Sequence, residues 1–248
     1  MNVVEADGLG KRYGGTWALG DCTLEIPAGR VTALIGPNGA GKSTLLNLTV
    51  GLTAPSAGAV TVLGGLRAGS PAALDGIAFV AQDTPLYKTL SVADMIYITR
   101  SLNRRFDNAY ARARLGELGI PPKRKAGKLS GGQQAQLALT LALARRPRLL
   151  VLDEPVAMLD PIARHDFMAT VLAAATDDGV SVLLSSHVLT ELERVANYLV
   201  LLARGQVRLA GEVNDLLATH GQASLEELAM TYLRATGERE NPTSEVTR

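Results

Sequence analysis

The chain has 248 residues, of which 47% are hydrophobic, and this is enough material for a full α/β core with one subsidiary lobe. The formal net charge of +1 provides no global field that would attract nucleic acid or an acidic partner. Cys22 is the only cysteine, which excludes a disulfide within the chain and fits a reducing compartment.

The first residues of the chain lack the basic start and the apolar stretch of a signal peptide, so we expect none. No apolar run approaches the ~20 residues that are needed to span a bilayer. The longest candidates, such as residues 137–144, are predicted to be core helix. We therefore expect that any membrane span belongs to another chain.

Residues 3–30 are predicted to form strands and turns. Cys22, Leu24 and Ile26 alternate with polar residues, which is typical of a half-buried strand. Tyr13 stands in a loop beside two glycines, where an exposed ring could stack on a flat base. The alternative for Tyr13 is an ordinary surface tyrosine at a turn.

A glycine loop lies between a predicted strand at 31–35 and a predicted helix that opens at 45–48. The loop sequence matches the motif G-x-x-x-x-G-K-[ST]. In this motif the glycines let backbone N–H groups point at an anion, and the positive end of the helix dipole adds to the attraction. We predict that Lys42 reaches the β- and γ-phosphates, Ser43 ligates Mg²⁺ and Thr44 bonds the α-phosphate. The alternative is a glycine turn before an ordinary helix. The loop comprises Gly36, Pro37, Asn38, Gly39, Ala40, Gly41, Lys42, Ser43 and Thr44.

Two further strands are predicted at 60–63 and 77–81, and the second of them ends at Gln82. Ser91 and Asp94 form a capping box that starts a helix, and residues 92–120 are predicted to be helical up to a pair of prolines. Because this block carries no strand signal, we place a separate helical lobe at about 83–146.

Residues 100–128 contain nine basic and two acidic residues. A solvated helix face is one interpretation, and proximity to anionic lipid headgroups is another. Nucleic-acid binding would need interleaved aromatic residues, and only Phe106 and Tyr110 lie nearby. We expect no nucleic-acid partner.

Strands and helices alternate again from residue 148. We predict one α/β domain over 1–220, followed by a short C-terminal helix and a frayed polar tail over 221–248. The predicted strands are 148–152 and 180–185, the helices are 162–175, 188–196, 212–219 and 224–235, and a hairpin pairs 198–202 with 206–210.

A second anion-binding geometry opens the apolar helix predicted at 133–146. Ser130 precedes Gly131 and Gly132 at the helix start, where free N–H groups could meet an anion. This geometry lies in the helical lobe and the lysine-bearing loop lies in the core, so one copy of the chain could close over the nucleotide held by another. The alternative is an ordinary N-cap.

In its motifs and in their order along the chain, the sequence resembles the nucleotide-binding domain of ATP-binding cassette (ABC) proteins over about 3–215. The resemblance implies a P-loop NTPase core of the α/β class, with an antiparallel β subdomain and an inserted helical lobe. It also implies a head-to-tail dimer with a second copy or a related subunit. The implied nucleotide-binding residues outside the P-loop are Tyr13 on the adenine, Gln82 of the Q-loop, the signature residues Ser130, Gly131, Gly132 and Gln133, and Asp160 of the D-loop.

The strand at 148–152 runs into Asp153 and Glu154, at the end where open α/β sheets bind ligands. Asp153 could hold the Mg²⁺ hydration shell together with Ser43 and Gln82, and Glu154 could orient the attacking water. The alternative is a solvated acidic turn. The catalytic residues expected from the sequence are Lys42, Glu154 and the switch histidine, His187, which could donate to the γ-phosphate.

Two departures from the family pattern are evident. Val156-Ala157-Met158 places a bulky residue in the D-loop, and Gln134-Ala135-Gln136 stands where relatives often have a basic residue. Neither contacts Lys42, Glu154 or His187 in the expected arrangement, so we expect a competent site that uses ATP and Mg²⁺.

The resemblance implies the ATPase subunit of an ABC transporter, which is cytoplasmic and held at the inner face of the membrane by a separate permease subunit. We expect an exporter, because the C-terminal extension is too short for the large regulatory domain of some importers. The alternative is a soluble ABC ATPase that serves an assembly process such as iron–sulfur cluster building. The transported substance cannot be read from this chain.

Overall fold

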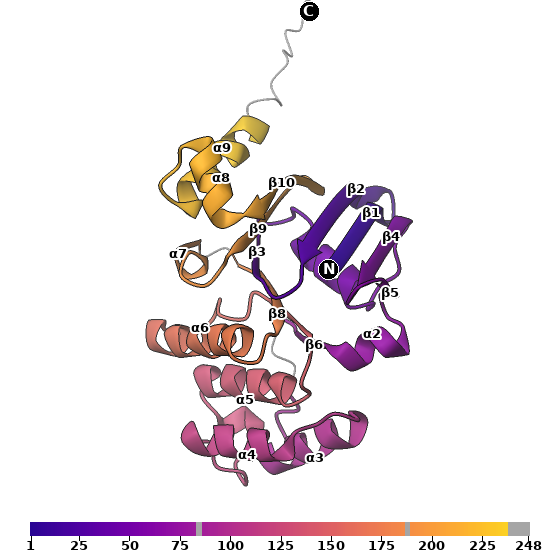
Figure 1. The fold of residues 1–248 in the computed structure, drawn as a ribbon. Helices are drawn as coiled ribbons and strands as arrows, with labels where there is room; N and C mark the ends of the chain where they lie inside the picture. Colours follow the sequence, from indigo (N-terminus) through magenta and orange to yellow (C-terminus); the bar gives the residue numbers. More distant parts are fainter. Residues whose placement is uncertain (83–85, 187–188, 238–248) are drawn as a thin grey trace, which may run out of the picture.

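The computed structural model describes residues 1–82, 86–186 and 189–237, and these form two sheets with helices around them (Figure 1). Within these residues, no helix combines the length and the apolar character that crossing a membrane requires. The predicted α/β class, with an antiparallel β subdomain and a helical lobe, is confirmed. The predicted polar tail after Gly237 lies outside the described residues.

The first sheet is antiparallel, and its strand order is β2-β1-β4-β5. The alternation predicted around Cys22 is confirmed, since Cys22, Leu24 and Ile26 are buried while the residues between them are exposed. This period of two gives the sheet one apolar face. Its strands are β1 (Asn2–Tyr13), β2 (Thr16–Pro27), β4 (Ala57–Val62) and β5 (Leu66–Arg67).

The second sheet has the order β10-β9-β3-β8-β7-β6, and all its pairs are parallel except β9 with β10. The carboxyl ends of β3, β8 and β7 therefore meet at one edge of the sheet, which is where open α/β sheets bind ligands. The strands are β3 (Val31–Ile35), β6 (Ile77–Val80), β7 (Leu149–Asp153), β8 (Ser181–Ser185), β9 (Tyr198–Ala203) and β10 (Gln206–Glu212).

Helices cover both faces of this second sheet. On β7, Leu149 and Val151 pack toward α1 and the antiparallel sheet, while Leu150 and Leu152 pack toward α5 and α6. A strand that is buried on both faces is mostly apolar, as Leu149–Leu152 of β7 are. In the described chain, the helices outside residues 83–128 are α1 (Lys42–Thr49), α2 (Pro71–Gly76), α5 (Gly131–Leu143), α6 (Pro161–Thr176), α7 (Leu189–Leu192), α8 (Val213–His220) and α9 (Leu225–Gly237).

The prediction of one continuous helix over 92–120 is wrong. The structure has α3 (Val92–Leu102) and α4 (Asn108–Glu117), separated by an extended Asn103. The physical reason is a competing cap: the Asp107 carboxylate accepts the N–H of Tyr110 and starts a new helix. The predicted capping box of Ser91 and Asp94 at the start of α3 is confirmed.

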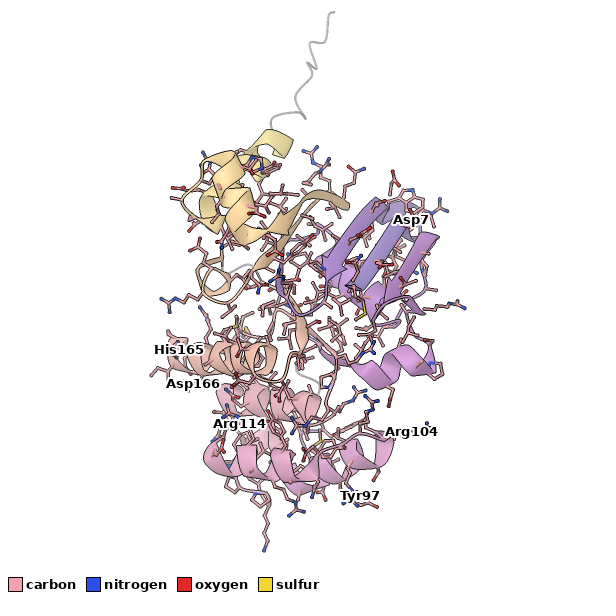
Figure 2. The ribbon with its side chains drawn as sticks, viewed as in Figure 1. Asp7, Tyr97, Arg104, Arg114, His165 and Asp166 are labelled. Atoms are coloured by element: carbon pink, nitrogen blue, oxygen red, sulfur yellow. The ribbon has the colours of Figure 1, made fainter. Side chains whose placement is uncertain are left out.

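The helical lobe is joined to the core by α5 and by a contact between α4 and α6. Leu137 and Leu141 of α5 pack in the lobe, whereas Leu139 packs in the core. Arg114 extends from α4 toward α6 (Figure 2), where its Nη2 donates to Thr170 Oγ1 at 2.7 Å. The lobe also includes the short 3₁₀ helix η1 (Ala126–Lys128).

The basic stretch at 100–128 lies in this lobe. Tyr97 and Arg104 project from the lobe, at the end of the molecule that is far from Asp7 (Figure 2). Arg105 pairs with Asp75 at 3.6 Å, and Arg114 pairs with Glu117 at 3.3 Å.

The predicted helix over 188–196 is also too long. Helix α7 ends at Leu192, and the chain then turns so that the Asn197 N–H donates to the Val31 carbonyl and leads into β9. The Glu193 carboxylate accepts the N–H of Leu225 at 2.6 Å, which fixes the start of α9 against this turn. The last part of the expected helix is therefore a turn, which tertiary hydrogen bonds tie to β3 and to the start of α9.

Candidate functional site

A cleft of about 790 Å³ opens at the carboxyl edge of the second sheet. It gathers residues from the β1–β2 hairpin, the glycine loop with the start of α1, the end of β6 and the segment after β7. Sequence reasoning named most of them, and Ala18 is an addition. The lining residues are Tyr13, Ala18, Asn38, Gly39, Ala40, Gly41, Lys42, Ser43, Thr44, Gln82, Glu154, Ala157 and Met158.

Two glycines of the loop cannot be replaced without moving the backbone. A Cβ on Gly36 would lie 2.2 Å from the Leu202 carbonyl oxygen, so β9 passes directly against the start of the loop. Gly41 has a φ of 102°, and a Cβ there would lie 2.6 Å from the Ala18 carbonyl oxygen. The tip of the β9–β10 hairpin supports the loop as well, because the Gly205 N–H donates to the Ala40 carbonyl at 3.1 Å.

Lys42 begins α1 and carries its ammonium group back across the loop. Its Nζ donates to the carbonyls of Gly36 at 2.8 Å and Pro37 at 3.3 Å. The same Nζ lies 3.8 Å from Glu154 Oε1, with side-chain exposures of 6% for Lys42 and 12% for Glu154. A cation this deeply buried needs polar partners, and the loop carbonyls and Glu154 provide them.

Asp153 and Glu154 end β7 beside Ser185, which ends β8. Asp153 and Ser185 are register partners in the parallel pair, and the Ser185 hydroxyl donates to Asp153 Oδ1 at 2.6 Å. The Glu154 N–H donates to the same hydroxyl oxygen at 2.9 Å. Glu154 has a φ of 45°, a left-handed conformation that is uncommon for residues other than glycine.

The signature residues do not line this cleft. Ser130 caps α5 instead, because its hydroxyl accepts the Gln133 N–H while the Gln133 side chain accepts the Ser130 N–H, both at 3.2 Å. Gly131 is exposed and Gly132 is half-buried. The structure therefore keeps the two predicted anion sites apart within one chain.

Asp160 also has a local partner. Its Oδ1 accepts the N–H groups of Ile162 and Ala163, both at 3.0 Å, and so caps α6. The bulky Met158 projects from the segment before it with 92% of its side chain exposed. His187 lies outside the described residues.

Sequence reasoning did not find Ser185, although a signal was present. Ser185 and Ser186 are two small polar residues at the end of an apolar strand, directly before His187. Both are buried in the structure. A buried hydroxyl at the carboxyl end of a parallel strand is expected to have a specific hydrogen-bond partner.

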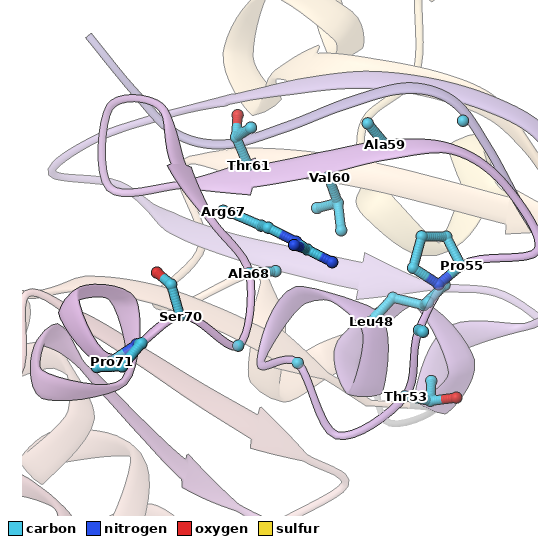
Figure 3. Close-up of a pocket in the computed structure, with 14 residues that line it drawn as sticks. Leu48, Thr53, Pro55, Ala59, Val60, Thr61, Arg67, Ala68, Ser70 and Pro71 are labelled. Atoms are coloured by element: carbon cyan, nitrogen blue, oxygen red, sulfur yellow. The ribbon is translucent and has the colours of Figure 1, made fainter.

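A second hollow of about 630 Å³ lies elsewhere, between the end of α1, β4 and the segment from β5 to α2 (Figure 3). The Arg67 side chain extends across it toward Leu48 and Pro55. Its lining includes none of the predicted nucleotide-binding residues. The predicted phosphate-binding residues Asn38–Thr44 line the first cleft and not this hollow.

Comparisons with known proteins agree with these motifs. A family model described as ABC transporter matches residues 19–157. The lantibiotic transport ATP-binding protein SrtF of Streptococcus pyogenes is 33% identical over 227 residues, which cover 91% of this chain and 95% of that protein. The thiamine import ATP-binding protein ThiQ of Escherichia coli O157:H7 is 32% identical over 207 residues, which cover 82% and 89%.

Among solved structures, the chain is similar to a dimeric post-hydrolysis state of an ATP-binding cassette bound to ADP and Pi. The TM-score is 0.73 and the sequence identity is 25%. The similarity covers 85% of this chain and 98% of the other one.

Proposed function

This chain belongs to the ABC transporter family, and on that premise we propose that it is the ATP-hydrolysing subunit that drives a separate transmembrane permease. The observation that carries the proposal is the buried approach of Lys42 to Glu154 across the cleft. A phosphate-binding lysine and a carboxylate that can orient water then face the same space, as phosphoryl transfer to water requires.

The glycine loop binds the triphosphate of ATP in this proposal. Its backbone N–H groups and the N-terminus of α1 attract the phosphates, and Lys42 neutralises charge on the β- and γ-phosphates. Thr44 bonds the α-phosphate. The exposed ring of Tyr13, which lines the cleft, stacks on the adenine.

The oxygen donors around the loop fit Mg²⁺, which prefers carboxylate, hydroxyl and amide oxygens. Ser43 and Gln82 line the cleft, and Asp153 is buried at the end of β7. We assign these three residues to the metal and its hydration shell. Mg²⁺, when bound, neutralises charge that develops on the β- and γ-phosphates.

Hydrolysis in this scheme depends on positioning more than on covalent chemistry. Glu154 accepts a hydrogen bond from the attacking water and orients it in line with the γ-phosphorus. His187 follows β8 in the sequence and is assigned to donate to the γ-phosphate. Its role rests on its position in the sequence.

The second anion site is used between two chains. Ser130, Gly131, Gly132 and Gln133 of one subunit close over the ATP held in the cleft of the other, with Asp160 near the interface. This arrangement is supported by the cleft lining, which does not include the signature residues of the same chain, and by the dimeric cassette that the chain resembles. The facing subunit is a second copy or a related chain.

The permease holds this subunit at the cytoplasmic face of the membrane. Both relatives named above carry transport or import in their names, which favours a permease over a soluble assembly partner. The lantibiotic transport protein and the thiamine import protein are 33% and 32% identical to this chain, so sequence identity favours neither direction of transport. Transport assays in membrane vesicles that contain the complex measure the direction.

Co-purification of the full chain from its own host tests the proposal. We expect a membrane protein to co-purify only when detergent is present, and we expect ATP hydrolysis that depends on Mg²⁺. A soluble partner recovered without detergent would contradict the transport role. Absence of ATP hydrolysis in the intact complex would contradict the enzymatic role.

A further inference from the structure

The two acids at the end of β7 share one hydroxyl group on the neighbouring strand. Ser185 Oγ lies 2.6 Å from Asp153 Oδ1 and 2.9 Å from the backbone nitrogen of Glu154. The Ser185 side chain is fully buried, with 0% exposure. Water therefore does not compete for this hydroxyl in the described structure.

The geometry determines how the hydroxyl is used. A serine hydroxyl has one proton, which goes to Asp153 Oδ1, and the oxygen then accepts the Glu154 N–H. This hydrogen bond engages Oδ1 of Asp153 and leaves Oδ2 for the Mg²⁺ hydration shell. One side chain thereby fixes an atom of each of the two acids.

Glu154 needs such support because of its backbone conformation. A left-handed φ of 45° carries a conformational cost for a residue with a Cβ, and it persists only when the surroundings impose it. The Glu154 N–H also donates to the Ser185 carbonyl at 3.2 Å, so the hydroxyl supplies the shorter of two bonds from the same residue. This conformation directs the Glu154 side chain toward Lys42, whose Nζ lies 3.8 Å away.

We propose that Ser185 is a positioning residue for ATP hydrolysis, which orients the Asp153 carboxylate toward the metal shell and holds Glu154 in its left-handed, water-orienting conformation. This role rests on the proposed ATPase function. Ser185 touches neither ATP nor water in the scheme and acts only through the two acids.

The Ser185→Ala variant tests the role in the full chain assembled with its partner. We expect kcat for ATP hydrolysis to fall about tenfold to a hundredfold, the usual loss when a supporting partner of a metal-binding group is removed. ATP binding in EDTA should be unchanged, whereas the gain in affinity on adding Mg²⁺ should shrink.

Ser181→Ala is the matched control. Ser181 is a buried serine on the same strand, and its hydroxyl accepts the Gly29 N–H at 2.9 Å, at the opposite end from the acids. We expect this variant to keep kcat. Ser185→Thr restores a hydroxyl at the same place and should recover a large part of the lost rate. If Ser185→Ala does not fold, Ser185→Cys fills nearly the same space with a weak hydrogen-bonding group and should lose kcat in the same way.

Wild-type kcat in a folded Ser185→Ala variant would overturn the role. An equal loss in Ser181→Ala would also overturn it, because the loss would then come from damage to the strand. Failure of the wild-type complex to hydrolyse ATP would instead refute the proposed function, so the two failures are distinguishable.

Discussion

At the residue scale, the cleft holds a cation and an anion that come from distant parts of the chain. Lys42 is buried against two loop carbonyls, and Glu154 approaches it from the end of β7. Each group has a different expected role, since Lys42 binds phosphate and Glu154 acts on water. Variants of the two residues should therefore separate nucleotide binding from hydrolysis.

Glu154→Gln should retain ATP binding and lose hydrolysis. The amide keeps the shape of the side chain but accepts a proton poorly, so we expect kcat to fall about a hundredfold to ten-thousandfold, the range of a general base. ATP should then accumulate in a closed dimer, which size-exclusion chromatography with ATP detects. Asp166→Asn, on the exposed part of α6, is the matched control and should behave as wild type. A kcat equal to that of wild type in the Glu154→Gln variant would show that Glu154 does not act on the attacking water.

Lys42→Ala should lose affinity for ATP. A hydrogen bond to a charged group contributes enough free energy that its removal raises Kd about tenfold to a hundredfold. Trp17 is the only tryptophan and adjoins the cleft residue Ala18, so its fluorescence provides a titration signal. Lys123→Ala in the helical lobe should leave the titration curve unchanged. A Kd for Lys42→Ala equal to that of wild type would contradict the phosphate assignment.

At the element scale, Asp107 connects α4 to the end of α5. Its Oδ1 accepts the Tyr110 N–H at 2.8 Å, and its Oδ2 accepts from Arg146 Nη2 at 2.8 Å. The Asp107 N–H donates to the Ala144 carbonyl as well. The hydrogen bond from Tyr110, followed by that from Arg146, lowers the pKa of Asp107, and the same pairing raises the pKa of Arg146.

Stability of the fold should depend on pH through this carboxylate. Because the pKa of Asp107 is lower in the folded chain than the unfolded value of about 3.9, the unfolded chain binds the proton first as the pH falls. The stabilisation is therefore complete above about pH 4 and is lost as the pH falls through the folded pKa. Asp107→Asn should melt below wild type at pH 7, and the two thermal midpoints should converge as the pH falls below about 4.

Circular dichroism melting curves between pH 7 and pH 3 measure this convergence. Parallel curves for wild type and Asp107→Asn across that range would show that the Asp107 charge does not stabilise the lobe. The Asn side chain can still cap α4, so the comparison isolates the charge from the cap.

At the scale of the whole molecule, the cleft and the signature residues lie in different parts of the chain. The cleft belongs to the core, whereas Ser130 caps α5 where the helical lobe begins. A site whose parts lie on two chains should be slow when the chains are apart. Hydrolysis is thus a property of the assembly in this scheme.

ATP hydrolysis per molecule should increase with protein concentration. We expect Ser130→Ala to lower the rate at saturating concentration about tenfold to a hundredfold, the contribution of a hydrogen bond to a charged group. Ser91→Ala is the matched control, because Ser91 forms the same kind of capping box at the start of α3. Phosphate release over a dilution series measures both effects. A rate independent of dilution and of Ser130 would refute the two-chain site.

Much of the site could be predicted because its motifs are local. A glycine loop between a strand and a helix is recognised from residues that are neighbours in the chain, and Asn38–Thr44 line the cleft. The paired acids at the end of β7 were found for a similar reason, since an apolar strand that stops at two carboxylates indicates a ligand edge. The capping boxes of α3 and α5 also depend on contacts three residues apart.

By resemblance, the sequence by itself determined the family and the α/β class, and local patterns of glycine and apolar residues placed the glycine loop between its strand and its helix. The tertiary structure decided how Ala144 and Arg146 hold Asp107 where the helical block 92–120 breaks, how Glu193 fixes the start of α9, and how Ser185 holds the two acids. These features depend on contacts between segments far apart in the chain. The strand order places Ser185 beside Asp153, and the hydrophobic pattern of neither strand predicts which strand lies next to it.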